Sequence, residues 1–180
     1  MKTTILLGIL ISSGLSLAAD KPGEFKPLIG APKKDAEPKG VLQKLLDGNL
    51  EKLEGKKLSK VKVDVQPAKY YVFYYSASWC QPCHQFTPSL VEFYNKNKSA
   101  DFEIYLISHD QEEKAMEGYV EEAKMPWPVL KLGKVEKFEK EIKHGVDGIP
   151  FLAICNPDGT VVQKGNAGTV LGKLQSLVGK

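Results

Sequence analysis

Six consecutive residues, Tyr70 to Tyr75 (YYVFYY), constrain the fold of this 180-residue chain more than any other segment. Aromatic and β-branched side chains favour a strand. A run without polar alternation predicts a strand that is covered on both faces, as in a parallel sheet. Apolar residues then recur at helical spacing from Phe86 to Tyr94, and a second apolar run follows from Phe102 to Ile107. Together these segments predict a β-α-β unit with a right-handed crossover.

The segments around this unit complete an α/β domain. Two apolar runs joined by the turn Asn156-Pro157-Asp158-Gly159 predict a β-hairpin near the C-terminus. We therefore predict a central mixed β-sheet with helices on both faces. The patterns predict further strands at 50–53, 58–65, 149–155 and 160–163, and helices around 41–46, 115–123, 135–142 and 170–178.

The chain divides into three parts along its length. Residues 1–19 have the pattern of a secretory signal peptide, with Lys2 ahead of a short apolar core and small residues at the end. Residues 20–40, rich in proline, glycine and lysine, predict an extended leader. Residues 41–180 form the predicted folded domain. We expect an exported protein, periplasmic or secreted, without stable membrane insertion because the apolar core is short.

The charged residues argue against one class of function. The chain has a formal net charge of +3, and all 25 of its basic residues are lysine. Bidentate recognition of phosphate favours arginine, and a nucleic-acid binder carries a larger basic excess. The lysines, including those between Lys131 and Lys140, therefore predict a solvated surface of mixed charge and no binding of nucleic acid.

Two cysteines follow the YYVFYY strand closely. Cys80 and Cys83 stand at the carboxyl end of that strand, where open α/β sheets place catalytic groups, and Pro82 fits the first turn of a helix. A thiolate of Cys80 at the N-terminus of this helix has a lowered pKa and is a nucleophile near neutral pH. Cys83 lies one helical turn further on, on the same face. The spacing predicts a redox-active pair with an exposed attacking sulfur and a shielded resolving sulfur.

The same spacing permits other chemistry. C-x-x-C-H is the attachment pattern of c-type haem, with His84 as axial ligand, and zinc is an alternative with Cys155 as a fourth ligand. The strand that precedes the motif is unlike the mostly helical setting of c-type haem, and a second C-x-x-C pair is absent. A disulfide across so short a loop is a poor structural crosslink. The candidates for a second axial ligand are His109, Met116, Met125 and His144.

The segment SASWCQPCHQFTPSLVEFY resembles the active-site segment of thioredoxin-fold proteins, most closely in their tryparedoxin and nucleoredoxin branch. The resemblance runs from about Leu50 to the C-terminal helix. It implies a thioredoxin fold and a thiol–disulfide oxidoreductase that needs no bound cofactor and no metal. It rests on the motif from Trp79 to Cys83, on Pro88, on Met125-Pro126-Trp127 and on Gly148-Ile149-Pro150.

The resemblance also implies roles for individual residues. Cys80 attacks a substrate disulfide, and Cys83 resolves the mixed disulfide, so that the pair alternates between dithiol and disulfide. Pro150 is expected to be cis, with the Ile149 backbone binding the substrate as an added strand, and Trp79 at the substrate-facing rim. The implied partners are disulfide-containing exported proteins and an unidentified electron donor or acceptor. We expect a monomer.

Two positions depart from the family pattern. Many thioredoxins carry a buried aspartate six residues before the first cysteine, and Tyr74 stands at that place here. A phenol is a poor base at neutral pH. Gln81 replaces the residues that are more common between the two cysteines, so the direction of electron transfer stays open.

The other cysteine, tryptophan, histidine and aspartate candidates are predicted to lie in the core, in loops or on the surface. Cys155, in an apolar strand, is predicted to be a buried and inert thiol. Trp127 fits the core and the rim equally well. A loop or the surface is predicted for His84, His109, Asp110 and His144. A role of His84 in tuning the pKa of the cysteines, and proton transfer by His109 and Asp110, are the alternatives.

We therefore expect an exported thiol–disulfide oxidoreductase that acts on protein disulfides through Cys80 and Cys83. A c-type haem electron carrier and a non-catalytic binding module of the thioredoxin fold are the alternatives.

Overall fold

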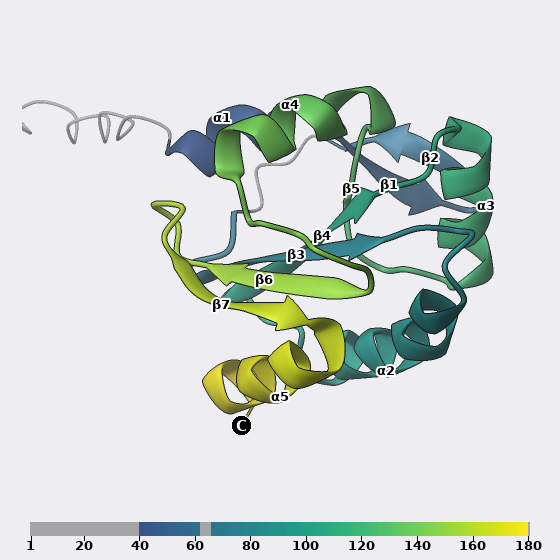
Figure 1. Cartoon of the computed structure of the whole chain (residues 1–180). Coiled ribbons are helices and arrows are strands. Elements are labelled where there is room, and N and C mark those ends of the chain that lie inside the picture. The colour runs from purple at the N-terminus through teal and green to yellow at the C-terminus, as the bar shows by residue number, and fades with distance from the viewer. Residues whose placement is uncertain (1–39, 62–65, 180) are drawn as a thin grey trace, which may run out of the picture. The chain divides into compact units, whose positions relative to one another are not determined.

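A computed structural model of the chain describes residues 40–61 and 66–179. The predicted signal peptide and all but the last residue of the predicted leader lie outside the described residues. The helices and strands are shown in Figure 1. In chain order they are α1 (Val41–Leu46), β1 (Leu50–Glu54), β2 (Lys57–Lys60), β3 (Tyr70–Ser76), α2 (Gln81–Asn97), β4 (Phe102–Ser108), α3 (Glu113–Glu122), β5 (Val129–Leu130), α4 (Leu132–Ile142), β6 (Phe151–Cys155), β7 (Val161–Asn166) and α5 (Ala167–Val178).

The strands of the described residues form one mixed sheet in the order β2-β1-β5-β4-β3-β6-β7. β3 runs parallel to β4 along its whole length, from the pair Tyr70 and Phe102 to the pair Ser76 and Ser108. On its other edge β3 pairs antiparallel with β6. The YYVFYY strand thus lies inside the sheet with a neighbour on each edge, as its lack of polar alternation predicts.

Side chains of β3 enter two separate cores. Val72 and Tyr74 pack in one core with α2, α3 and α5. Tyr71, Phe73 and Tyr75 pack in the other with α1 and α4. Figure 1 shows α1 and α4 on one side of the sheet and α2 and α5 on the other. The predicted mixed sheet with helices on both faces is therefore confirmed.

The structure differs from the sequence prediction at the edges of several elements. β5 was not predicted: it has two residues, which is too short for a periodic pattern to appear. β6 begins at Phe151 and not at Ile149, because Pro150 has no N–H to contribute to a ladder. β2 ends at Lys60, and residues 62–65 of the longer predicted strand lie outside the described residues.

The two tryptophans occupy opposite environments. Trp127 is fully buried, and its ring packs edge-on against Tyr74 and Tyr94 with centroids 6.3 Å and 5.6 Å away. Trp79 is 66% exposed, as its predicted rim position requires. The Met125-Pro126-Trp127 segment therefore belongs to the core and not to the rim of a binding site.

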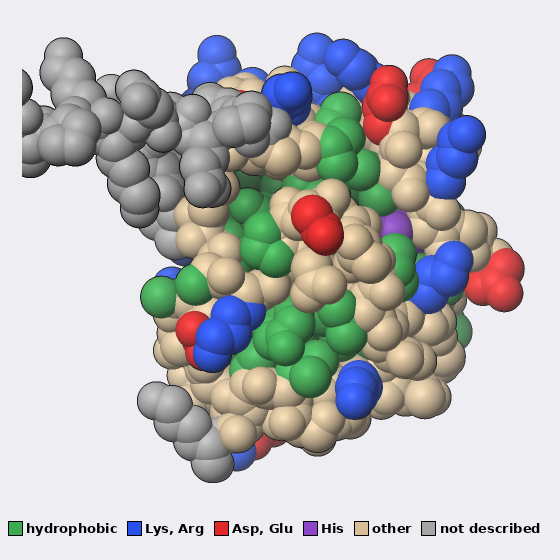
Figure 2. Space-filling model, turned by 90° about the vertical axis from the view of Figure 1, so that its left-hand side faces the viewer, with side chains coloured by type: hydrophobic (Ala, Val, Ile, Leu, Met, Phe, Trp, Pro, Cys, Tyr) green, Lys and Arg blue, Asp and Glu red, His purple; other side chains and the backbone are tan. Residues whose placement is uncertain are grey.

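The surface carries charges of both signs. Figure 2 shows one face on which lysine side chains lie mainly at the periphery, with acidic side chains among them and apolar side chains between. Along α4, Lys134, Lys137 and Lys140 are exposed, whereas Val135 and Phe138 are buried. The predicted solvated face is therefore present at these three lysines, whereas Lys131 is partly buried and donates to the Gly48 carbonyl at 2.9 Å. In the described part of the chain, none of the helices has the length and apolar character needed to cross a bilayer.

The two tryptophans provide a matched test of the core. Trp127→Ala is expected to lower the free energy of unfolding by about 3–5 kcal/mol, because it leaves a cavity between two tyrosine rings. Trp79→Ala is the control and is expected to change it by less than about 0.5 kcal/mol. Urea unfolding followed by circular dichroism measures both. Equal effects of the two substitutions would contradict this assignment.

Candidate active site

Cys80 lies where β3 ends and α2 begins. Its backbone N–H donates to the Ala77 carbonyl at 3.2 Å, which closes a turn over residues 77–80. Cys80 is then the N-cap of α2, and its sulfur accepts the Cys83 backbone N–H at 3.2 Å. Pro82 stands in the first helical turn, where a missing N–H leaves no bond unmade. The sulfur therefore sits where the helix favours negative charge.

Cys80 and Cys83 form a disulfide, with their Cα atoms 5.2 Å apart. Cys83 is fully buried and Cys80 is 4% exposed. Both residues are thus buried in the disulfide form, and the predicted exposure of Cys80 is not seen there. The pair packs against Ala77 and Ile149 in a small apolar cluster.

A proline loop faces the two cysteines. The peptide bond between Ile149 and Pro150 is cis, and the carbonyl oxygen of Ile149 lies 3.8 Å from the sulfur of Cys80. No hydrogen bond among the described residues uses the Ile149 N–H. The structure thus brings Ile149 and Pro150 to the dithiol from a segment almost seventy residues away, and the family-based expectation of a cis Pro150 agrees with this geometry.

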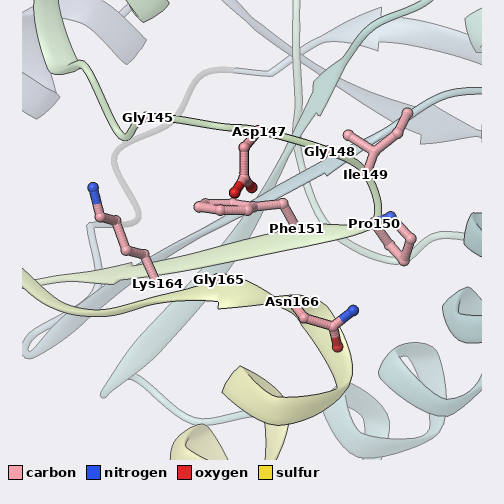
Figure 3. A pocket seen from close by; sticks show the side chains of 9 residues that line it. All are labelled: Gly145, Asp147, Gly148, Ile149, Pro150, Phe151, Lys164, Gly165 and Asn166. Atoms are coloured by element: carbon pink, nitrogen blue, oxygen red, sulfur yellow. The ribbon is translucent and has the colours of Figure 1, made fainter.

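A hollow of about 480 Å³ borders this loop. Figure 3 shows it next to Ile149 and Pro150, with the Asp147 side chain beside the Phe151 ring and the Lys164 side chain on the neighbouring strand β7. Its lining includes backbone of the loop that precedes the proline, together with Asn166 at the end of β7. An extended chain that lies beside the cysteines has room for its side chains here.

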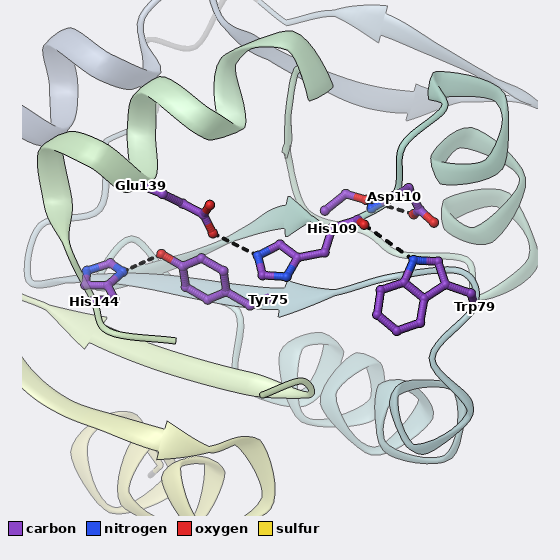
Figure 4. A network of polar contacts seen from close by, with 7 residues as sticks. Tyr75, Trp79, His109, Asp110, Glu139 and His144 are labelled. Carbon is purple, nitrogen blue, oxygen red and sulfur yellow. Dashed lines mark hydrogen bonds and ion pairs between the residues drawn. The ribbon is translucent and has the colours of Figure 1, made fainter. Parts of the chain in front are cut away.

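A second hollow, of about 470 Å³, lies beside Trp79. The Trp79 indole N–H donates to the His109 carbonyl at 3.4 Å, and His109 Nε2 lies 2.8 Å from a carboxylate oxygen of Glu139 (Figure 4). The Trp79 ring is thus linked to the backbone that follows β4. Glu136 and Glu139 give this hollow its acidic character.

Asp110 anchors the turn that carries Trp79. Its carboxylate accepts the Ser78 N–H at 3.0 Å, the Ser78 hydroxyl at 2.6 Å and the Ser108 hydroxyl at 2.8 Å. The residue is only 7% exposed. Asp110 was predicted as a loop residue, and the structure shows a buried carboxylate that fastens the turn before Cys80 to the end of β4.

Hydroxyl groups fill the place of the buried aspartate of the family. Thr87 Oγ1 donates to the Cys83 carbonyl at 2.8 Å, so the hydroxyls of Tyr74 and Tyr119, at 2.8 Å and 2.7 Å, donate to Thr87. Burial raises the pKa of Tyr74, so its phenol stays protonated at neutral pH. This cluster of described residues is neutral, and Tyr74 is not a base, as predicted.

His144 is buried, and its predicted surface position is wrong. Its Nδ1 lies 2.6 Å from the Tyr75 hydroxyl and its Nε2 lies 3.3 Å from the Cys155 sulfur. The ring contacts Phe73 and Phe138 in the core between the sheet and α4. Burial, with the nearby ammonium of Lys164, lowers the pKa of His144 to about 4. The imidazole is therefore neutral at physiological pH.

Cys155 is the buried thiol that its apolar strand predicts. Burial raises its pKa to about 12, so it is not a nucleophile at neutral pH. It pairs in register with Tyr71 at one end of β3, whereas Cys80 follows the other end. Cys155 is thus remote from the dithiol and cannot complete a zinc site with it. Among the described residues no cluster of three or more His, Cys, Asp or Glu side chains has the geometry of a metal site.

The surroundings of His84 disfavour haem attachment. Its Nε2 lies 2.6 Å from the Ser78 carbonyl oxygen and is directed back toward the protein. Met116 and Met125, two candidates for a second axial ligand, are buried in the core with α2 and α3. His84 is half-buried, so its predicted surface position is only partly correct.

A helix-capping sulfur with a disulfide partner one turn away, faced by a cis-proline loop, defines a dithiol site of the thioredoxin class. Sequence comparison agrees. The model of the thioredoxin-like family matches residues 68–161. Probable nucleoredoxin 1 of Arabidopsis thaliana is 35% identical over 145 residues, which cover 79% of this chain and 25% of that protein.

Two further comparisons come from trypanosomatids. Tryparedoxin of Trypanosoma brucei brucei is 42% identical over 92 residues, which cover 50% of this chain and 62% of that protein. The crystal structure of tryparedoxin I from Crithidia fasciculata superposes with a TM-score of 0.58 and 37% identity, over 73% of this chain and 90% of that one. The chain thus spans less than two thirds of the length of both curated relatives. It belongs to the thioredoxin-like family, with the thioredoxin fold and the C-x-x-C pair of thiol–disulfide oxidoreductases.

Reasoning from the sequence missed the parts played by Asp110, Thr87 and His144. Asp110 had a weak signal, since it follows a buried strand at the same sheet edge as Cys80. Thr87 lies four residues after Cys83 on one helix face, which is compatible with a bond to the Cys83 carbonyl. His144 had no signal, because its partners Tyr75 and Cys155 are brought to it only by the fold.

Stability is expected to depend on pH through His144. The unfolded chain protonates this histidine near pH 6.5, and the folded protein does so only near pH 4. Between these values the unfolded state binds more protons, so stability falls as the pH falls, by up to about 1.4 kcal/mol per pH unit from this group. Urea unfolding at several pH values gives the free energy of unfolding at each pH. This free energy is expected to change less steeply with pH in His144→Gln than in the wild type. Identical slopes would contradict the buried neutral imidazole.

Proposed function

We propose that this protein exchanges disulfides in other exported proteins through the Cys80–Cys83 pair. The observation that carries the proposal is the position of the Cys80 sulfur. It caps α2, accepts the Cys83 N–H at 3.2 Å and lies 3.8 Å from the Ile149 carbonyl oxygen. In the reduced protein a thiolate at this place is stabilised by the helix N-terminus. Membership of the thioredoxin-like family supports the same chemistry.

In the reductive direction the thiolate of Cys80 attacks one sulfur of a substrate disulfide. The substrate S–S bond breaks, a disulfide between Cys80 and the substrate forms, and the second substrate sulfur leaves as a thiolate that takes up a proton. Cys83 then loses its proton and attacks the Cys80 sulfur. This step forms the Cys80–Cys83 disulfide and releases the remaining substrate thiolate. Two electrons pass to the substrate, so an external dithiol must reduce the protein before the next turnover, and the reverse sequence oxidises a substrate dithiol.

The loop before Pro150 supports an extended polypeptide as the substrate. In this proposal the substrate strand accepts a hydrogen bond from the Ile149 N–H, which no hydrogen bond among the described residues uses. Its neighbouring side chains lie in the hollow of about 480 Å³ that borders the loop. Trp79, which is 66% exposed, offers an aromatic surface next to the same cysteines. The hollow beside the Pro150 loop and the Trp79 ring would both contact the substrate without taking part in the exchange itself.

The two cysteines are expected to respond differently to substitution. The wild type should accelerate reduction of insulin by dithiothreitol. Cys80→Ser should lower the rate to that of the uncatalysed reaction, because no attacking thiolate remains. Cys83→Ser should accumulate a mixed disulfide with insulin, which mass spectrometry detects. Cys155→Ser is the matched control and should retain wild-type activity, since this thiol is buried and remote.

Failure of the wild type to reduce insulin faster than dithiothreitol alone would count against catalysis. If Cys80→Ser then binds insulin with the same affinity as the wild type, a binding module of the same fold would be favoured.

The exported setting is a second part of the proposal and rests on the signal-like sequence of residues 1–19. The protein recovered from outside the cytoplasm is expected to begin at Asp20, which N-terminal sequencing and intact-mass measurement determine. Leu7→Lys, which interrupts the apolar core, should leave the precursor unprocessed. An intact Met1 on the wild-type protein, found only inside the cytoplasm, would contradict export and leave the dithiol chemistry unaffected.

A further inference from the structure

The histidine of the C-x-x-C-H motif takes no part in the exchange described above, yet its side chain is held in a definite position. His84 Nε2 lies 2.6 Å from the Ser78 carbonyl oxygen. Its ring packs on the Tyr119 ring, with centroids 4.6 Å apart and an interplanar angle of 43°. A carbonyl oxygen only accepts, so Nε2 must carry a proton in this contact. The imidazole is thus a hydrogen-bond donor, whether it is neutral or charged.

The acceptor, Ser78, lies inside the turn that carries the reactive sulfur. The turn is closed by the bond from the Cys80 N–H to the Ala77 carbonyl at 3.2 Å. The N–H and hydroxyl of Ser78 bind the Asp110 carboxylate, at 3.0 Å and 2.6 Å. With His84 on its carbonyl, each polar group of Ser78 is engaged, so the turn is held both from the end of β4 and from α2.

We propose that His84 is a positioning residue for thiol–disulfide exchange, acting by a hydrogen bond to the Ser78 carbonyl that holds the 77–80 turn. This inference rests on the proposed function. The turn ends at Cys80, whose sulfur must stay at the helix N-terminus to accept the Cys83 N–H at 3.2 Å. Loss of the histidine donor leaves a half-buried carbonyl without its partner and lets the turn relax. The sulfur then loses part of the stabilisation of its thiolate.

The histidine is itself braced by its neighbours. The Tyr119 hydroxyl belongs to the buried cluster under Cys83, where it lies 2.7 Å from Thr87 Oγ1 and 2.9 Å from Ser76 Oγ. The ring on which His84 packs is therefore fixed at its far end. The bond to Ser78 runs back over the first turn of α2, so one side chain joins the helix that carries Cys83 to the turn that carries Cys80.

A matched pair of substitutions separates the donor from the ring. His84→Gln keeps an N–H donor at a similar reach and removes the ring. His84→Phe keeps a ring against Tyr119 and removes the donor. If the hydrogen bond is what matters, the glutamine variant retains wild-type behaviour and the phenylalanine variant does not.

Two readouts on the reduced mature protein test this without a protein substrate. The first is the rate at which iodoacetamide alkylates Cys80, and the second is the equilibrium between the Cys80–Cys83 dithiol and glutathione, followed by Trp79 fluorescence. In His84→Phe the alkylation rate is expected to fall and the equilibrium to move toward the disulfide. Each change is expected to be about two- to ten-fold, which corresponds to the net contribution of one hydrogen bond. His84→Gln is expected to stay within about two-fold of the wild type.

Other outcomes overturn the proposal. Wild-type values for His84→Phe would show that the donor is dispensable. Equal losses in both variants would show that the hydrogen bond is not what matters. A lowered melting temperature with unchanged alkylation and equilibrium would show that His84 serves only the stability of the fold. An effect of His84→Phe that appears at pH 8 but not at pH 6 would instead assign it the role of a base. Failure of the wild type with insulin would count against the proposed function and leave these readouts intact.

Discussion

The burial of β3 on both faces is the constraint on which the rest of the structure depends. Its side chains enter two cores at once, one with α2, α3 and α5 and the other with α1 and α4. The strand is also paired on both edges, by β4 and by β6. Its carboxyl end therefore has a fixed place at one edge of the sheet. The turn and helix that follow deliver Cys80 to that place, and β6 delivers the cis-proline loop beside it.

The polar groups packed beneath Cys83 are hydroxyls and not carboxylates. These hydroxyls belong to Tyr74, Thr87 and Tyr119. Burial raises the pKa of Tyr74, so its phenol stays protonated at neutral pH. The buried carboxylate of Asp110 is engaged by Ser78 and Ser108. Proton transfer from Cys83 thus has no built-in carboxylate acceptor in this cluster, and the helix N-terminus carries the electrostatic stabilisation of the attacking sulfur.

Much of the fold was predictable from particular patterns. The YYVFYY run, the helical spacing after Pro82 and the hairpin turn at Asn156 to Gly159 led to the correct strands and helices, because each is a local pattern. The C-x-x-C spacing led to the dithiol, and the resemblance to thioredoxin-fold proteins led to its facing loop at Pro150. The two-residue strand β5 and the exact start of β6 were not predictable in this way. They depend on pairing with strands that are distant in sequence.

By itself the sequence placed two thiols one helical turn apart after a buried strand, which spacing and periodicity predict. The spacing left haem and zinc as alternatives, and the resemblance of the whole segment to thioredoxin-fold proteins favoured thiol–disulfide exchange. Only the tertiary structure decided what the polar side chains around them do. The three histidines look alike in the sequence, yet His84 binds a turn, His109 pairs with Glu139 and His144 is buried neutral against Cys155. The physical reason is that burial and hydrogen-bond partners are set by contacts between distant segments, and these contacts exist only once the sheet has formed.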